Sequence, residues 1–278
     1  MNAQKKIIAA LDVSTRDEAA LLVEELVPYV GCFKIGLELM TAIGGPQAVE
    51  LIHSLSGNVF YDGKFKDIPN TVAQASRAVA QQGVAMFNIH CLAGSEAMRK
   101  TREAVDTAIS VDETIMLPRK VLTSPLILGV TILTSLNYND LVELGIFKEL
   151  NIANPEERAH IERETMENLV VRHLARLAQE NGLDGVVASP KEIKSIREYC
   201  GPDFKIVTPG IRPLWANVDD QKRFTTPAEA IFAGADYLVI GRPITKPPKN
   251  IGSPANAANL FLEEVSGALE KLEKGGSQ

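Results

Sequence analysis

Cysteine is scarce in this chain, which has three such residues among 278, Cys32, Cys91 and Cys200. Their number is odd, they lie far apart, and their spacing matches no zinc motif, so we expect neither a disulfide framework nor a zinc site. The sequence also lacks a surplus of positive charge, with 29 Lys and Arg against 35 Asp and Glu. Nothing global therefore recruits nucleic acid or an anionic membrane, and an anionic ligand needs locally placed cations.

Long hydrophobic runs are missing as well. No apolar run reaches the roughly 18 residues that a membrane-spanning helix requires. The chain passes from Lys5 and Lys6 directly into the strand-like run 7–13, without the pattern of a secretory signal. We therefore expect a cytoplasmic protein with no membrane partner.

What the sequence does contain is a regular alternation of short apolar runs and segments with helical periodicity. Repeated strand–helix units imply a parallel sheet, and eight of them in this length imply a closed barrel. The fold class expected is α/β, a single (β/α)8 TIM barrel over residues 1–274, followed by a flexible tail at 275–278. The expected strands are 7–11, 32–36, 59–64, 85–90, 127–132, 185–189, 205–208 and 237–241, and the clearest helices are 16–26, 71–82, 95–110, 163–181 and 227–233.

Two connections are longer than the rest, 111–124 and 136–160. Loops of this length are usually functional or mobile, but a surface insertion without a role is an equally good interpretation here.

A barrel of this kind places its catalytic residues at the carboxyl ends of its strands. Polar residues do fall at these ends, in chain order Asp12, Lys34, Asp62, Lys64, His90, Thr131, Thr134, Ser189, Arg212 and Arg242. A single histidine such as His90 is more often a hydrogen-bonded core residue than a functional one. The other polar ends predict one site on one face of the barrel.

The third expected strand carries the most informative group of charges. Asp62 and Lys64 are two residues apart, so a regular strand projects both from one side, and Asp67 follows at the exit. With Lys34 from the neighbouring strand they can form an alternating ionic network, either a structural ring or an active site. Pairing keeps Lys64 cationic, which suits a proton donor and disfavours a Schiff-base amine. The lysines also disfavour a divalent metal at the two carboxylates.

The last two strand ends read TPGIRP and VIGRPIT, and both match a phosphate site. In such barrels the loops after the seventh and eighth strands often bind phosphate. Pro209 and Gly241 lie in these loops, and Arg212 and Arg242 supply guanidinium groups that match a phosphate. The alternative is that both arginines are ordinary surface residues. Gln221 lies in the segment between the loops, which is long enough to be a lid.

These residues together resemble the orotidine 5'-phosphate decarboxylase family. Its hallmark is similar to DGKFKDIPNT at 62–71, which fits without a gap. The resemblance spans nearly the whole chain, through ALDV at 10–13, FKIG at 33–36, VTILTS at 130–135, VTPGIRP at 207–213 and AGADYLVIGRPIT at 233–245.

The resemblance implies decarboxylation of orotidine 5'-monophosphate to uridine 5'-monophosphate, without cofactor or metal, by a homodimer with sites at the subunit interface. Lys64 is implied as the proton donor to C6, with Asp62 beside the departing carboxylate. Lys34 bridges Asp62 and the ribose, and Asp12 holds a ribose hydroxyl. The remaining implied contacts are Asp67 and Thr71 from the partner subunit, Thr134 on the pyrimidine, Arg212, Gln221, Gly241 and Arg242 on the phosphate, and Ile68 and Pro209 in substrate binding.

Two alternatives differ from this interpretation. Related keto-gulonate-phosphate decarboxylases and hexulose-phosphate synthases resemble D-x-K-x-x-D too, but use magnesium held partly by an acid on the second strand, where this chain has Lys34. A catalytically silent nucleotide-binding barrel is the other, and the complete set of Asp62, Lys64 and Asp67 argues against it.

Overall fold

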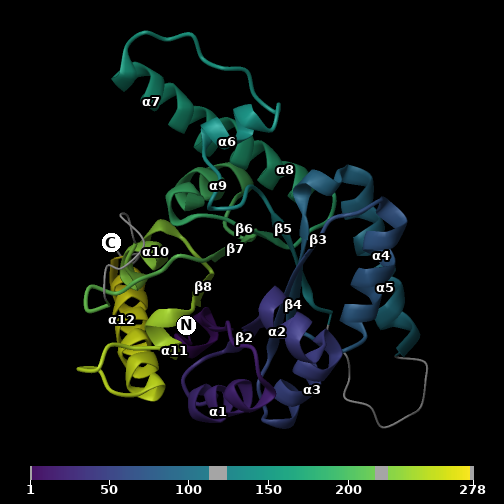
Figure 1. The fold of residues 1–278 in the computed structure, drawn as a ribbon, viewed down its shortest axis with the longest axis vertical. Helices are drawn as coiled ribbons and strands as arrows, with labels where there is room; N and C mark the ends of the chain where they lie inside the picture. The colour runs from purple at the N-terminus through teal and green to yellow at the C-terminus, as the bar shows by residue number, and fades with distance from the viewer. Residues whose placement is uncertain (1, 113–123, 217–224, 276–278) are drawn as a thin grey trace.

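A computed structural model describes residues 2–112, 124–216 and 225–275 of the chain. In these ranges eight parallel strands follow one another around a closed barrel (Figure 1), and β1 pairs with β8 to complete it. The expectation of a (β/α)8 barrel is confirmed. The strands are β1 (Ile7–Leu11), β2 (Cys32–Ile35), β3 (Val59–Phe65), β4 (Met86–His90), β5 (Leu126–Val130), β6 (Gly185–Val187), β7 (Lys205–Thr208) and β8 (Tyr237–Ile240).

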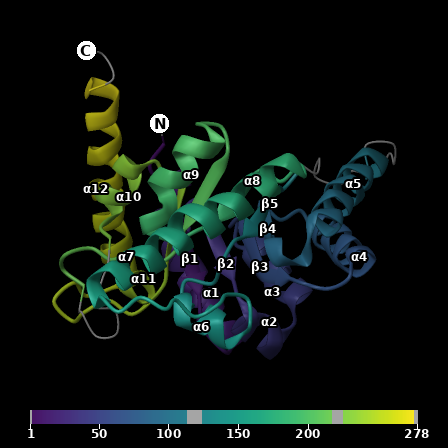
Figure 2. The same cartoon turned by 90° about the horizontal axis from the view of Figure 1, so that it is seen from above.

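Helices cover the outside of the barrel, with α12 on the opposite side from α4 and α5 (Figures 1 and 2). Helix-capping residues mark where several of these helices begin. The Thr15 hydroxyl accepts the Glu18 N–H in the first turn of α1, and Pro69 is the first residue of α4. The surrounding helices are α1 (Arg16–Leu26), α2 (Leu37–Ile43), α3 (Gly45–Ser54), α4 (Pro69–Ala80), α5 (Ser95–Asp112), α8 (Arg172–Glu180), α9 (Ile193–Cys200), α10 (Pro227–Ala233), α11 (Arg242–Thr245) and α12 (Pro254–Gly275).

The two faces of the strands build two separate cores. Outward residues such as Phe33 and Phe87 pack against the helices, whereas inward residues fill the barrel. Each fully buried large apolar side chain stabilises the fold by about 1.5–3 kcal/mol relative to an exposed one. The inward core consists of Ile8, Ala10, Cys32, Phe60, Met86, Leu128, Val207 and Val239.

The inward apolar core ends partway along the strands. On β2 the next inward residue after Cys32 is Lys34, on β3 Asp62 follows Phe60, and on β4 Asn88 follows Met86. The barrel interior is therefore apolar toward the amino ends of the strands and polar toward their carboxyl ends.

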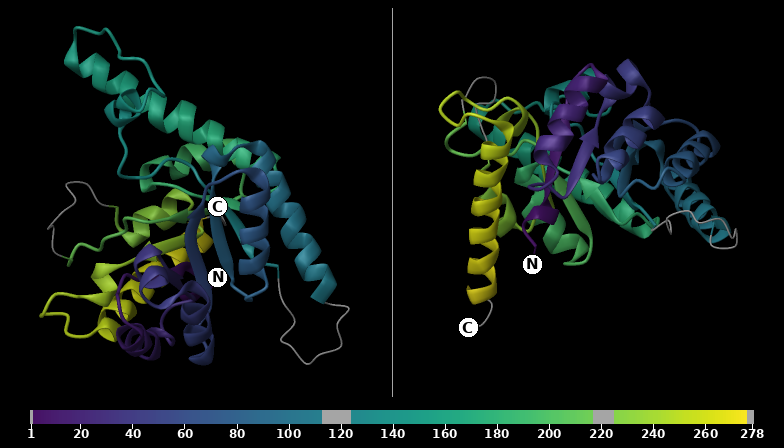
Figure 3. Two further views of the ribbon diagram at one scale, coloured as in Figure 1. Left: turned by 45° about the vertical axis from the view of Figure 1, so that its right-hand side comes forward. Right: turned by 90° about the horizontal axis from the view of Figure 1, so that it is seen from below.

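The long connection 136–160 contains α6 (Tyr138–Glu143) and the first part of α7 (Pro155–Glu164). A π-helical segment (Thr165–Val171) continues α7 into α8, so the expected helix at 163–181 begins earlier than the sequence predicts. α7 projects away from the barrel (Figures 1 and 3). The other long connection, 111–124, falls almost entirely outside the described residues.

The remaining sequence expectations concern the cysteines, the membrane and the tail. All three cysteines are buried and free, and burial raises the pKa of Cys91 to about 12, which disfavours its thiolate. In the described ranges no helix combines the length and apolar character needed to cross a membrane. Gly275 is the last residue of α12, and the rest of the expected tail, 276–278, lies outside the described residues.

Candidate active site

Four charged side chains form a chain of ion pairs at the carboxyl ends of the first three strands. Lys64 Nζ lies 2.7 Å from Asp62 Oδ1, and Lys34 Nζ lies 3.4 Å from Asp62 Oδ2. Lys34 Nζ also lies 3.2 Å from Oδ1 of Asp12, which follows β1. The structure thus brings together Asp12, Lys34, Asp62 and Lys64 as an alternating network, with Asp12 rather than Asp67 as its second carboxylate.

Burial distinguishes the two lysines of this network. The Asp62 side chain keeps 11 % of its exposure and that of Lys34 12 %, whereas Lys64 keeps 32 %. Removing one partner of a buried ion pair generally costs about 3–5 kcal/mol, because the other charge is left without compensation. Asp62 is therefore held by two ammonium groups, of which that of Lys64 belongs to the more exposed side chain.

The backbone that carries Asp62 and Lys64 is not a regular strand. Tyr61 pairs with Phe87 and Phe65 with Ile89, so three residues of β3 lie opposite a single residue of β4. Lys64 has φ +48°, in the left-handed region, which costs a non-glycine residue about 1–3 kcal/mol. The two side chains meet as predicted, but an irregularity in the strand, not its regular alternation, brings them together. Such strain is typical of functional positions.

Asn88 is a site residue that the sequence argument missed. It is the residue of β4 opposite the irregularity, it is fully buried, and its side chain contacts both Asp62 and Lys64. The available signal was a polar amide at an inward position of the run MFNIH.

His90 ends β4 and is buried. Burial lowers its pKa, and the nearby positive charges of Lys66 and Lys64 lower it further, so the neutral ring is favoured. Its Nδ1 atom has no hydrogen-bond partner among the described residues. His90 is thus buried, as a core residue would be, but within the described ranges its Nδ1 lacks the hydrogen bond which that interpretation expects.

Asp67, Ile68 and Thr71 lie at the start of α4, and all three are exposed. The Asp67 carboxylate accepts the backbone N–H of Ile68 at 2.7 Å, and no ion pair within the described ranges joins it to Lys34 or Lys64. A single subunit therefore does not bring these three residues into the network.

The loops after β7 and β8 lie at the same end of the barrel. Ile211 bridges to Thr225, and the Arg212 N–H donates to the Thr225 carbonyl at 3.1 Å, which closes the base of the intervening segment. Gly241 lies beside the network, because a Cβ atom there would stand 3.5 Å from Asp12 Oδ2. Arg242 follows directly as the first residue of α11. Pro209 lies in the first of these loops, and Gln221 falls outside the described residues.

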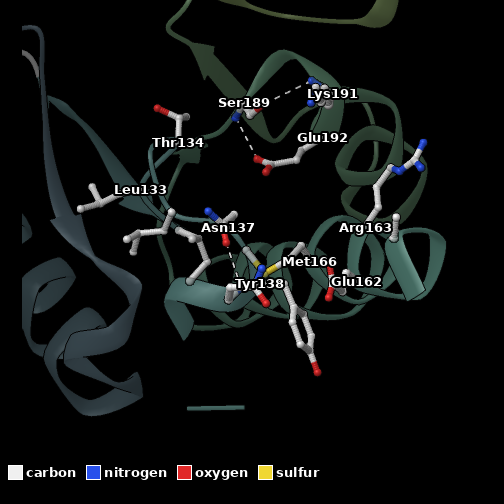
Figure 4. A pocket seen from close by; sticks show the side chains of 14 residues that line it. Leu133, Thr134, Asn137, Tyr138, Glu162, Arg163, Met166, Ser189, Lys191 and Glu192 are labelled. Atoms are coloured by element: carbon white, nitrogen blue, oxygen red, sulfur yellow. Dashed lines mark hydrogen bonds between the residues drawn. The ribbon is translucent and has the colours of Figure 1, made fainter. Parts of the chain in front are cut away.

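Thr134 follows β5 and lines a cavity of about 430 Å³ (Figure 4). Asn137 and Tyr138, at the start of the excursion 136–160, form part of its wall. Its other wall residues include Glu162, Arg163 and Met166 from α7 and the π-helical segment, and Ser189, Lys191 and Glu192 after β6. The long connection therefore shapes the space next to Thr134.

The carboxylates of this network are poorly suited to bind a metal ion. Among the described residues no three His, Cys, Asp or Glu side chains gather as a metal site. Asp12 and Asp62 are both paired with ammonium groups, which would repel a divalent cation.

The fold and its relatives define a (β/α)8-barrel enzyme, and the chain carries a lysine–aspartate network at the carboxyl ends of its first three strands. The model of the Orotidine 5'-phosphate decarboxylase / HUMPS family matches residues 5–255. The chain belongs to this family.

Individual relatives agree with the family match. The orotidine 5'-phosphate decarboxylase of Trichlorobacter lovleyi is 47 % identical over 268 residues, which cover 96 % of this chain and 98 % of the relative. That of Syntrophomonas wolfei is 43 % identical over 265 residues, covering 95 % and 99 %. The crystal structure of orotidine 5'-phosphate decarboxylase from Lactobacillus acidophilus superposes with a TM-score of 0.67 at 28 % identity, covering 94 % of this chain and 99 % of that one.

Proposed function

We propose how this chain carries out its reaction, the decarboxylation of orotidine 5'-monophosphate to uridine 5'-monophosphate in pyrimidine biosynthesis. The chain is a carboxy-lyase of this specificity. The observation that carries the proposed mechanism is the paired, partly open ammonium of Lys64 at the carboxyl end of β3.

Lys64 acts as the proton donor. Loss of carbon dioxide from C6 of the pyrimidine breaks the C6–carboxylate bond and leaves its electron pair on an sp² carbon, with no adjacent ring group to take up the charge. A fixed ammonium stabilises that charge as it forms and then transfers a proton to C6. The carboxylate of Asp62, 2.7 Å from Nζ, pairs with this ammonium and fixes its position.

The rest of the network positions the substrate. Asp62 lies beside the departing carboxylate, and its negative charge repels that of the substrate group, which raises the free energy of the ground state. Lys34, which contacts both Asp62 and Asp12, reaches the ribose, and Asp12 accepts a ribose hydroxyl.

The phosphate and the base occupy the neighbouring strand ends. Pro209, Arg212, Gln221, Gly241 and Arg242 form the phosphate site. Thr134, across the barrel mouth on the β5 side, contacts the pyrimidine. Binding energy from the remote phosphate then lowers the barrier at C6 through loop closure and orientation.

The active unit is a homodimer in which Asp67, Ile68 and Thr71 enter the partner's site. Their exposure supports this arrangement, since Ile68 keeps 67 % of its surface in the single subunit. Three other exposed apolar side chains follow the carboxyl ends of neighbouring strands and therefore lie on the same rim: Leu37 (63 %), Leu92 (43 %) and Leu133 (38 %). A rim of this character is typical of a protein interface.

Mixing two inactive variants tests the shared site. Lys64→Ala and Asp67→Ala should each be inactive alone, but a mixed dimer contains one site with both residues intact. Random exchange of equal amounts should restore about one quarter of wild-type activity, because half of the dimers are mixed and each has one working site of two. Activity is measured after co-refolding the two variants.

Co-refolded Lys64→Ala and Asp62→Ala are the matched control. Each site takes both Lys64 and Asp62 from the same subunit, so neither site of a mixed dimer is complete. Equal recovery in both mixtures, or none in the first, would contradict the contribution of Asp67 across the interface.

Activity should not depend on a divalent metal. Lys34 lies on the second strand where metal-dependent relatives carry an acid, and it pairs with both Asp12 and Asp62, so we expect the same turnover of orotidine 5'-monophosphate with and without EDTA. Loss of absorbance on decarboxylation is followed directly. An EDTA-sensitive rate that returns with magnesium would overturn the proposal.

A further inference from the structure

The irregular part of β3 is held by a side chain of the next strand. Asp62, Gly63 and Lys64 lie opposite Asn88 alone, because the pairing of β3 with β4 shifts between Tyr61 and Phe65. The Asn88 carboxamide fills this interruption, and none of its surface is exposed.

The carboxamide makes two short hydrogen bonds, one to each reacting residue of β3. Its Nδ2 group donates to Asp62 Oδ1 at 2.6 Å, and its Oδ1 accepts the backbone N–H of Lys64 at 2.7 Å. The orientation of the amide follows from chemistry, since only the NH2 group can donate to a carboxylate and only the oxygen can accept from a backbone N–H.

We propose that Asn88 is the positioning residue of this active site: one carboxamide fixes the Asp62 carboxylate and the left-handed backbone of Lys64 relative to each other. This inference rests on the proposed function, in which Lys64 protonates C6. Asn88 touches no substrate in this assignment and acts only through Asp62 and Lys64.

The Asp62 oxygen that Asn88 contacts is the one that also accepts from Lys64. Oδ1 receives Nδ2–H of Asn88 and Nζ–H of Lys64, while Oδ2 faces Lys34. Without the amide, this oxygen loses one of its two donors, and the Lys64 N–H loses its partner inside the barrel. Both changes let Asp62 and Lys64 move relative to each other. Small misplacements of reacting groups cost about a hundredfold in rate.

Near neutral pH neither of two small substitutions supplies the same pair of bonds at this position. An aspartate has the same shape, but its second oxygen would face the Asp62 carboxylate as a like charge. An alanine removes both bonds. The two substitutions therefore predict different behaviour with pH, which separates positioning from simple packing.

The experiment measures kcat, KM and the affinity for uridine 5'-monophosphate of Asn88→Asp and Asn88→Ala between pH 5 and 8. Near neutral pH we expect kcat per product-binding site to fall about a hundredfold in both variants. We expect KM and product affinity to change by less than about threefold, because the phosphate loops are untouched.

The ratio of variant to wild-type kcat is the decisive readout. In Asn88→Asp the new carboxyl and Asp62 share a site, so like charge raises the pKa of the pair. Below that pKa the protonated carboxyl donates to Asp62 and its other oxygen accepts the Lys64 N–H, as the amide does. The ratio for Asn88→Asp should therefore rise as pH falls, whereas the ratio for Asn88→Ala should stay level.

Asn58→Asp is the matched control. Asn58 precedes β3 at the opposite end of the barrel, where its Nδ2 donates to the Gly31 carbonyl at 3.0 Å. This variant should keep the wild-type kcat and pH profile. If Asn88→Asp does not fold, Asn88→Ala decides by its kcat at unchanged product affinity.

Wild-type kcat in both Asn88 variants, or a fall in kcat matched by an equal fall in product-binding sites, would overturn the role of Asn88. Failure of the proposed function is seen separately, because it requires Lys64→Ala to retain turnover. If Lys64→Ala is inactive and the Asn88 variants match the wild type, only the positioning role is wrong.

Discussion

Replacement of Lys64 by alanine is expected to lower kcat for orotidine 5'-monophosphate by more than about 10⁴-fold. In the proposed mechanism the substitution removes both the proton donor and the positive charge that stabilises C6, effects worth about 10²–10⁴-fold and 10²–10³-fold in other enzymes. Affinity for uridine 5'-monophosphate should be largely kept, since the phosphate loops remain. Turnover is measured by the change in absorbance, and product binding by calorimetry.

Lys205→Ala is a suitable control for this experiment. Lys205 also lies on a barrel strand beside an aspartate, with Nζ 4.0 Å from Asp236 Oδ1, but at the amino end of β7. It should keep the wild-type kcat. A Lys64→Ala protein with full activity would remove Lys64 from the mechanism.

Replacement of Arg242 by alanine is expected to raise KM for orotidine 5'-monophosphate by about 10- to 150-fold. A hydrogen bond to a charged group contributes about 1.5–3 kcal/mol, and every 1.4 kcal/mol changes affinity tenfold. The measurement is steady-state kinetics with substrate well above the raised KM, so that kcat is also defined.

Arg176→Ala controls for the loss of an exposed arginine. Arg176 lies on α8, where it pairs with Glu180 at 2.6 Å and donates to the Tyr199 hydroxyl. Its removal should leave KM unchanged. An unchanged KM in Arg242→Ala would place the phosphate elsewhere on the barrel.

Much of the fold and of the site could be predicted from sequence because the barrel imposes a simple rule. Buried parallel strands read as short apolar runs, and their carboxyl ends converge on one face. Polar residues that end such runs are therefore neighbours even when they are far apart in the chain. Asp12, Lys34 and Asp62 come from three strands, and the structure joins them as this rule predicts.

The remaining features depend on contacts that no local pattern encodes. The left-handed conformation of Lys64 carries no glycine or asparagine signal, because neighbouring groups and not local propensity impose it. Asn88 looks like a minor polar interruption of a strand until the shifted pairing with β3 is seen. The asparagines of 136–160 favour the prediction of a loop, but two of them, Asn137 and Asn154, are the N-caps of α6 and α7.

The conformation of Lys64 also has a consequence for heat resistance. A non-glycine residue at φ +48°, beside buried charges that must all stay paired, makes this end of β3 a weak point of the fold. Substitutions that relax this backbone or replace the charges with apolar groups offer the barrel added stability, and each removes part of the chemistry. Selection for thermal tolerance in this enzyme therefore has to act on other regions, such as the apolar barrel interior around Phe60 and Met86.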